Sequence, residues 1–90
     1  MVKTKLEILE KMHDDTMETV LYTEAECDLI QGRIFMITKT DKEAEQRRAV
    51  YNEALSQSKT KLRGHETMLA KIAKMIEEET KKNVVQIDGK

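Results

Sequence analysis

His13 and His65 are the only histidines of this 90-residue chain, and they are the side chains best suited to chemistry. Glu10 lies three residues before His13, and Glu66 directly follows His65. A glutamate and a histidine spaced by three residues point to the same side of a helix, as in di-iron carboxylate bundles. Glu10, His13, His65 and Glu66 are therefore candidate metal ligands.

The Glu-x-x-His spacing at Glu10 and His13 is similar to that of the two-helix encapsulated ferritins, in which dimerisation completes a four-helix di-iron site. This resemblance implies a metal-binding, ferritin-like bundle that uses Glu10, His13 and His65. The chain departs from that pattern, because it has one such motif and because Leu62 and Leu69 stand where bridging glutamates are needed. The two histidines are better explained as a polar layer that fixes helix register, with a pH switch as another alternative.

Other reactive side chains favour a non-enzymatic protein. Cys27 is the only cysteine, so the chain forms no internal disulfide and a cytoplasmic location is expected. A cysteine at an apolar position is usually a buried structural residue. The sequence has no glycine-rich phosphate loop, no CxxC pair and no Gly-x-Ser-x-Gly motif. We therefore expect no catalysis and no cofactor.

A basic patch formed by Lys39, Lys42, Arg47 and Arg48 raises the alternative of a small RNA- or DNA-binding helical hairpin. The net charge of −1 provides no general attraction to nucleic acids or to anionic membranes. No recognition motif accompanies the patch. A solvated helix end with salt bridges to Glu43 and Glu45 explains it better.

These side chains must be positioned by helices, because the chain has 37% charged residues, no proline and only three aromatic residues. Residues 41–82 are predicted to form one long helix, in which apolar or small residues recur at alternating steps of four and three. Thr40 to Glu43 matches a Ser/Thr-x-x-Glu capping box. Arg48 interrupts the seam, whose other members are Ala44, Tyr51, Leu55, Ser58, Leu62, His65, Leu69, Ile72 and Ile76.

Residues 3–37 are predicted to form a first helix with the same spacing. Its seam comprises Val2, Leu6, Leu9, His13, Thr16, Val20, Thr23, Cys27, Ile30, Ile34 and Ile37. A second apolar line accompanies the two seams, so the stripe is wider than a two-stranded coiled coil requires. This line comprises Ile8, Met12, Met17, Leu21, Leu29, Met36, Val50, Ala54, Met68 and Met75.

The two helices are predicted to form an antiparallel hairpin over residues 1–82, with a turn at residues 38–41. Charge supports this fold: the segment from Glu7 to Asp28 carries −7, and the segment from Lys39 to Arg63 carries +3. A turn centred near residue 39 pairs residues whose numbers sum to 78, which would place His13 opposite His65. It would also place Asp14, Asp15 and Glu18 beside Lys59, Lys61 and Arg63.

Two other architectures remain open at this point. The heptad pattern continues through the turn, so a single long helix in an antiparallel coiled-coil dimer makes the same pairings between chains. A break at Gly64 would instead produce three helices. Residues 83–90 are rich in β-branched residues and are predicted to form a flexible C-terminal tail.

The all-α hairpin, paired into a four-helix bundle, is expected to be a protein–protein interaction module: an adaptor, an assembly factor or an inhibitor, in a cytosolic or viral setting. Its partner would be itself, as a homodimer or higher oligomer, or another protein. No membrane contact is expected, and nucleic acid binding is disfavoured. The expected interface residues are Leu6, Leu9, Met12, Met17, Val20, Leu21, Ile30, Ile34, Tyr51, Leu55, Leu62, Met68, Leu69, Ile72, Met75 and Ile76.

Overall fold

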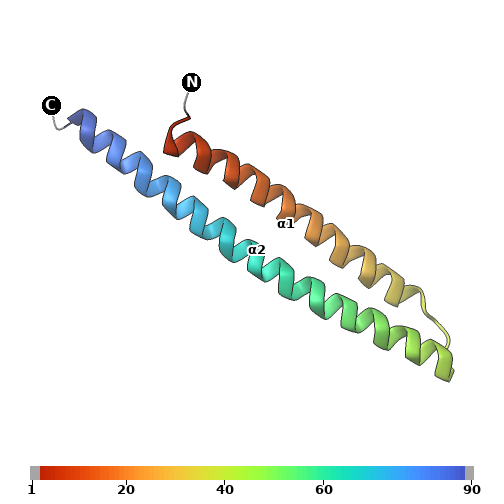
Figure 1. Cartoon of the computed structure of the whole chain (residues 1–90). Helices are drawn as coiled ribbons and strands as arrows, with labels where there is room; N and C mark the ends of the chain where they lie inside the picture. The colour runs from red at the N-terminus through yellow and green to blue at the C-terminus, as the bar shows by residue number, and fades with distance from the viewer. Residues whose placement is uncertain (1–2, 89–90) are drawn as a thin grey trace.

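The computed structural model describes residues 3–88, with side chains described as far as Lys82. Helix α1 (Lys5–Met36) and helix α2 (Lys42–Asp88) lie side by side and antiparallel, as Figure 1 shows. The molecule extends over 74 × 23 × 14 Å. The predicted all-α hairpin is confirmed. The single rod is not observed, and α2 continues through Gly64 without the break that a third helix would require.

Both helices begin at a side-chain cap. The Thr4 hydroxyl accepts a hydrogen bond from the Glu7 backbone N–H at 3.2 Å, and the Glu7 carboxylate accepts one from the Thr4 N–H at 3.3 Å. This capping box, which the sequence analysis missed, starts α1 at Lys5 rather than at residue 3. The box predicted at Thr40 is wrong by one residue, because Asp41 Oδ1 accepts from the Ala44 N–H at 2.9 Å and caps α2.

The chain reverses in an extended loop formed by residues 37–41, which overlaps the predicted turn. Ile37 has φ −82° and ψ 100°, so α1 ends at Met36 rather than at residue 37. The Arg48 guanidinium donates to the carbonyl of Ile37 at 3.2 Å and to the carbonyl of Lys39. Arg48, which the sequence analysis treated as an interruption of the seam, thus ties the loop to α2.

Helix α2 continues to Asp88, beyond its predicted end at Lys82. Residues 83–88, which the sequence pattern placed in a C-terminal tail, therefore belong to α2, while residues 89–90 lie outside the described part. The β-branched residues of this segment have only slightly lower helix propensity than their neighbours, by a few tenths of a kcal/mol each, roughly. A long preceding helix overcomes this cost, because propagation is easier than nucleation.

The seam between the helices forms the core. Leu9, Val20 and Cys27 of α1 and Ala44 and Ile72 of α2 are its buried apolar residues among those described. Thr23 is buried with them and donates its hydroxyl to the Thr19 carbonyl at 2.8 Å, which satisfies the polar group inside its own helix. Ser58 of α2 is also buried, and the other described seam residues are half-buried, because two helices alone cannot surround each other's a and d positions.

The register of the hairpin differs from the prediction by about one heptad. Lys5 Nζ lies 3.8 Å from Glu79 Oε2 at the open end, and Arg48 contacts Ile37 at the loop. The residue numbers of these pairs sum to 84 and 85 rather than to the predicted 78. The extended loop causes this shift, because it carries the chain along the hairpin axis before α2 begins.

Candidate functional site

His13 and His65 do not share a layer. The register set by the Lys5–Glu79 and Arg48–Ile37 contacts places His13 opposite Ile72 and His65 opposite Val20. The pocket that His13 shares with Ala73 and Ile76 agrees with this register. The two imidazoles are therefore separated by about 10 Å along the axis, two helical turns. The predicted polar layer, and the pH switch that required paired imidazoles within one chain, lose their geometric basis.

The four candidate metal ligands also lie in two separate places. Glu10, His13 and Asp14 line a shallow pocket with Ala73 and Ile76 of α2, near the open end of the hairpin. The Asp14 carboxylate lies 4.0 Å from His13 Nδ1. His65 and Glu66 lie outside this pocket, and no group of three or more His, Cys, Asp or Glu side chains within residues 3–82 is arranged to hold a metal ion.

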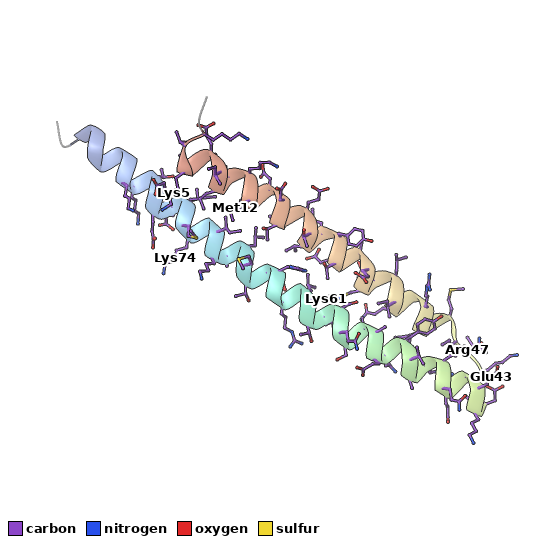
Figure 2. The ribbon with its side chains drawn as sticks, viewed as in Figure 1. Lys5, Met12, Glu43, Arg47, Lys61 and Lys74 are labelled. Atoms are coloured by element: carbon purple, nitrogen blue, oxygen red, sulfur yellow. The ribbon has the colours of Figure 1, made fainter. Side chains whose placement is uncertain are left out.

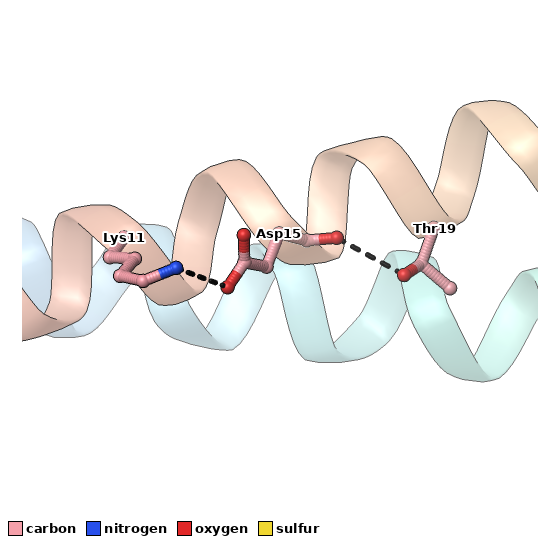
Figure 3. A network of polar contacts seen from close by, with 3 residues as sticks. All are labelled: Lys11, Asp15 and Thr19. Atoms are coloured by element: carbon pink, nitrogen blue, oxygen red, sulfur yellow. Dashed lines mark hydrogen bonds and ion pairs between the residues drawn. The ribbon is translucent and has the colours of Figure 1, made fainter.

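The acidic residues of α1 do not pair with the basic residues that the predicted register placed beside them. Asp15 Oδ2 instead accepts from Lys11 Nζ at 3.3 Å within α1, and the Asp15 carbonyl accepts from the Thr19 hydroxyl at 3.1 Å (Figure 3). Among the described side chains, Lys5 and Glu79 form the one ion pair between the helices. The predicted contacts of Asp14, Asp15 and Glu18 with Lys59, Lys61 and Arg63 are therefore wrong.

The basic patch near the loop is not a uniform surface of free cations. The guanidinium of Arg48 is half-buried and is bound to two loop carbonyls, so it contributes to folding. Lys39, Lys42 and Arg47 are exposed around it. Figure 2 shows Arg47 and Glu43 together beside the loop, where charges of both signs mix. This arrangement offers no continuous basic groove of the kind that follows a nucleic acid backbone.

The exposed apolar residues are best described by heptad positions, with the seam residues at a and d. On each helix, positions c and g then lie on one side of the seam, and positions b and e lie on the other. In an antiparallel pair, g faces g and e faces e, and the pocket that joins Glu10 to Ala73, both at e, fits this rule. We call the two long surfaces the g/c flank and the b/e flank.

Most exposed large apolar side chains lie on the g/c flank. Tyr22 is 73% exposed, Leu29 is 67% exposed and Met68 is 51% exposed. Figure 2 shows Met12 of this flank near the open end of the hairpin, close to Lys5 and Lys74 in this view. Among the residues whose side chains are described, eight of the eleven that are exposed, large and apolar belong to this flank: Ile8, Met12, Tyr22, Leu29, Met36, Val50, Met68 and Met75.

The b/e flank differs in composition. Met17, Leu21 and Phe35 of α1 are its exposed large apolar residues among those described, and the corresponding positions of α2 as far as Lys82 are alanine or polar. The second apolar line of the sequence includes Met17 and Leu21 together with the g/c residues. The predicted interface lacks Ile8, Tyr22, Leu29, Met36 and Val50, although the heptad position of each residue separates the two flanks.

The predicted interface residues thus occupy two environments. The seam members are buried or half-buried between α1 and α2: Leu6, Leu9, Val20, Ile30, Ile34, Tyr51, Leu55, Leu62, Leu69, Ile72 and Ile76. The other members are exposed: Met12, Met17, Leu21, Met68 and Met75. Only the second group is accessible to another molecule while the hairpin is folded.

The hairpin exposes more surface than a compact protein of its size. Its accessible surface is 7421 Å². A compact monomer of 10.4 kDa exposes about 5,400 Å² by the usual scaling with mass. The excess is about 2,000 Å² by the same scaling, more than the area that one partner contributes to a typical protein–protein interface.

Within the described part of the chain, neither helix contains a stretch that is long and apolar enough to cross a membrane. Comparison with protein-family models, with curated proteins and with solved structures finds no match to this chain.

Proposed function

We propose that this protein is a non-enzymatic protein–protein interaction module whose g/c flank packs against the helices of a partner in the cytoplasm. The biological role would be that of an adaptor, an assembly factor or an inhibitor. The observation that carries the proposal is the concentration of exposed large apolar side chains on one flank of the hairpin. Clusters of apolar side chains that a folded protein leaves exposed mark interaction sites.

The composition of the flank supports recognition of a helical surface. Methionine is its most frequent apolar residue, with Met12, Met36, Met68 and Met75 exposed. Methionine side chains adapt to irregular surfaces, and they recur where one surface must accept another. The spacing of the flank residues by three and four matches the ridges of a packed helix. The flank and the seam lie roughly a right angle apart around each helix, as in a four-helix bundle.

Site-specific photocrosslinking in cells tests this proposal. Leu29→p-benzoylphenylalanine places the probe on the g/c flank, and Leu21→p-benzoylphenylalanine places it on the b/e flank of the same helix. Both leucines are largely exposed, so both variants retain the folded seam. We expect crosslinks to protein, either to this chain or to another, from position 29 and few from position 21. Equal yields at the two positions, or none at position 29, would contradict the proposal.

A further inference from the structure

The partner chemistry can be specified further, on the premise that the g/c flank is a docking surface. We infer that its occupant is a second copy of this chain, related by a two-fold axis parallel to the hairpin, so that both loops lie at the same end. In this four-helix bundle, α1 packs against α2 of the partner subunit, and the two loops stay beside each other.

Two symmetric arrangements can bring two g/c flanks face to face. A two-fold axis along the hairpin places α1 on α2 of the partner. A two-fold axis across the hairpin places the loops at opposite ends and packs α1 on its own copy. Both arrangements are closed dimers, so the charges on the helices must distinguish between them.

The charges favour packing of α1 on α2. Helix α1 contains eight acidic and three basic residues, a net charge of −5, whereas α2 contains eight acidic and ten basic residues, a net charge of +2. On the flank itself, α1 carries Lys5, Asp15, Glu26 and Arg33, which together have no net charge. The flank of α2 carries four basic and two acidic residues, a net charge of +2. The crosswise arrangement would bring the positive flank of α2 against its own copy, which is unfavourable.

The lengthwise axis also fixes which residues meet, because rotation about that axis moves no residue along it. Within one hairpin, each flank residue of α1 has a neighbour at the same level in α2. In the dimer, that α1 residue meets the same α2 residue of the partner subunit. Met12 meets Met75 of the partner subunit, and Met36 meets Val50 of the partner subunit. These pairs place apolar side chains of the flank against each other and remove them from water.

Two pairs of opposite charge match in the same register. Asp15 lies level with Lys71 of the partner subunit. Within the hairpin, Lys11 binds Asp15 through Oδ2, which leaves Oδ1 available for a second cation. Glu26 similarly lies level with Lys61 of the partner subunit. Opposite charges at the edge of a helical seam select orientation more than they add affinity.

Gly64 lacks a side chain at a position where the proposed dimer places a large residue of the partner subunit. An added Cβ at this glycine would meet no atom within 4 Å, so nothing inside the hairpin requires glycine there. A glycine within a helix is less favourable than alanine, because it loses more conformational freedom on folding. In the proposed dimer Gly64 lies level with Tyr22 of the partner subunit, whose large ring would fill the space that a missing side chain leaves. Gly32 has similarly open surroundings but faces away from both surfaces, and nothing in the structure explains it.

Disulfide trapping with separately purified variants tests the arrangement. In a Cys27→Ala background, Tyr22→Cys and Gly64→Cys are prepared alone, mixed, allowed to exchange and oxidised gently. We expect covalent dimer in the mixture at roughly ten times the yield of either variant alone, because thiols held together have a high effective concentration. The readout is the covalent mass measured without reductant. Circular dichroism confirms that each variant is helical.

A second pair, Asp15→Cys with Lys71→Cys, should behave in the same way and replaces the first pair if the change at Gly64 prevents folding. The matched control on the b/e flank, Leu21→Cys with Arg63→Cys, should remain uncrosslinked. Efficient crosslinking of Tyr22→Cys alone would indicate the crosswise dimer and overturn the inference. A purified protein with the mass of one chain would also overturn it, yet photocrosslinks to another protein at position 29 would still support the proposed function.

Discussion

Arg48 illustrates how one side chain can disturb a sequence pattern and still stabilise the fold. It occupies a seam position where the heptad requires an apolar residue, but its alkyl part lies at the end of the seam and its guanidinium reaches the loop carbonyls. Those carbonyls would otherwise lack partners within the chain. The sequence pattern alone could identify the interruption, whereas the hydrogen bonds depend on the path of the loop.

The cap of α2 is another feature of single residues, and it provides a direct test. Thr40 and Asp41 are both good N-cap residues, so sequence rules cannot choose between them. The structure assigns the cap to Asp41. We predict that Asp41→Ala lowers the free energy of unfolding by about 1 kcal/mol, because the Ala44 N–H loses its acceptor.

Urea denaturation followed by circular dichroism measures this effect, and Thr40→Ala is the matched control. The Thr40 variant should unfold within about 0.5 kcal/mol of the original protein, as exposed substitutions usually do. A larger loss at Thr40 than at Asp41 would restore the capping box that the sequence predicted.

At the scale of the helices, the sequence is sufficient to predict both helices but not the register in which they pack. The four-three spacing identifies both helices, and clustered polar residues locate the loop. A shift of one heptad, however, places seam residues against seam residues again, so periodicity cannot distinguish the two registers. The register depends on how far the extended loop runs along the hairpin axis, and the heptad pattern contains no information about this distance. Because the predicted register was wrong by one heptad, the predicted histidine layer and the predicted charge pairs were both wrong.

The natural Cys27 can report on the register. Cys27 and Ser58 are 7% and 4% exposed, and both lie on the seam at the same level. The register expected from a symmetric turn would instead place Tyr51 opposite Cys27. We predict that Ser58→Cys forms an intramolecular disulfide with Cys27 on oxidation, whereas Tyr51→Cys retains two free thiols.

Mass spectrometry after alkylation distinguishes the two outcomes, because each free thiol adds one alkyl group. Disulfide formation requires the two Cα atoms to approach within about 7 Å, so the test is sensitive to a shift of one heptad. A disulfide in the Tyr51 variant, and none in the Ser58 variant, would show that the register described here is incorrect.

At the scale of the whole molecule, the hairpin exposes more solvent-accessible surface than a compact protein of its mass. Two helices bury a single seam and leave the g/c flank in water, so the isolated hairpin has a thin core for its length. Sequence analysis could predict this excess, since the apolar stripe is wider than one seam requires. The assignment of the exposed apolar residues to one flank required both the observed register and the heptad position of each residue. Pairing of two flanks would create a core of four helices.

Small-angle X-ray scattering of the purified protein tests the paired hairpin most directly, because it measures mass and length together. We predict the mass of two 10.4 kDa chains and a maximum dimension close to the 74 Å length of one hairpin. Side-by-side packing doubles the mass without extending the molecule. The mass of a single chain, or a doubled mass with a length approaching twice that of the hairpin, would contradict the account.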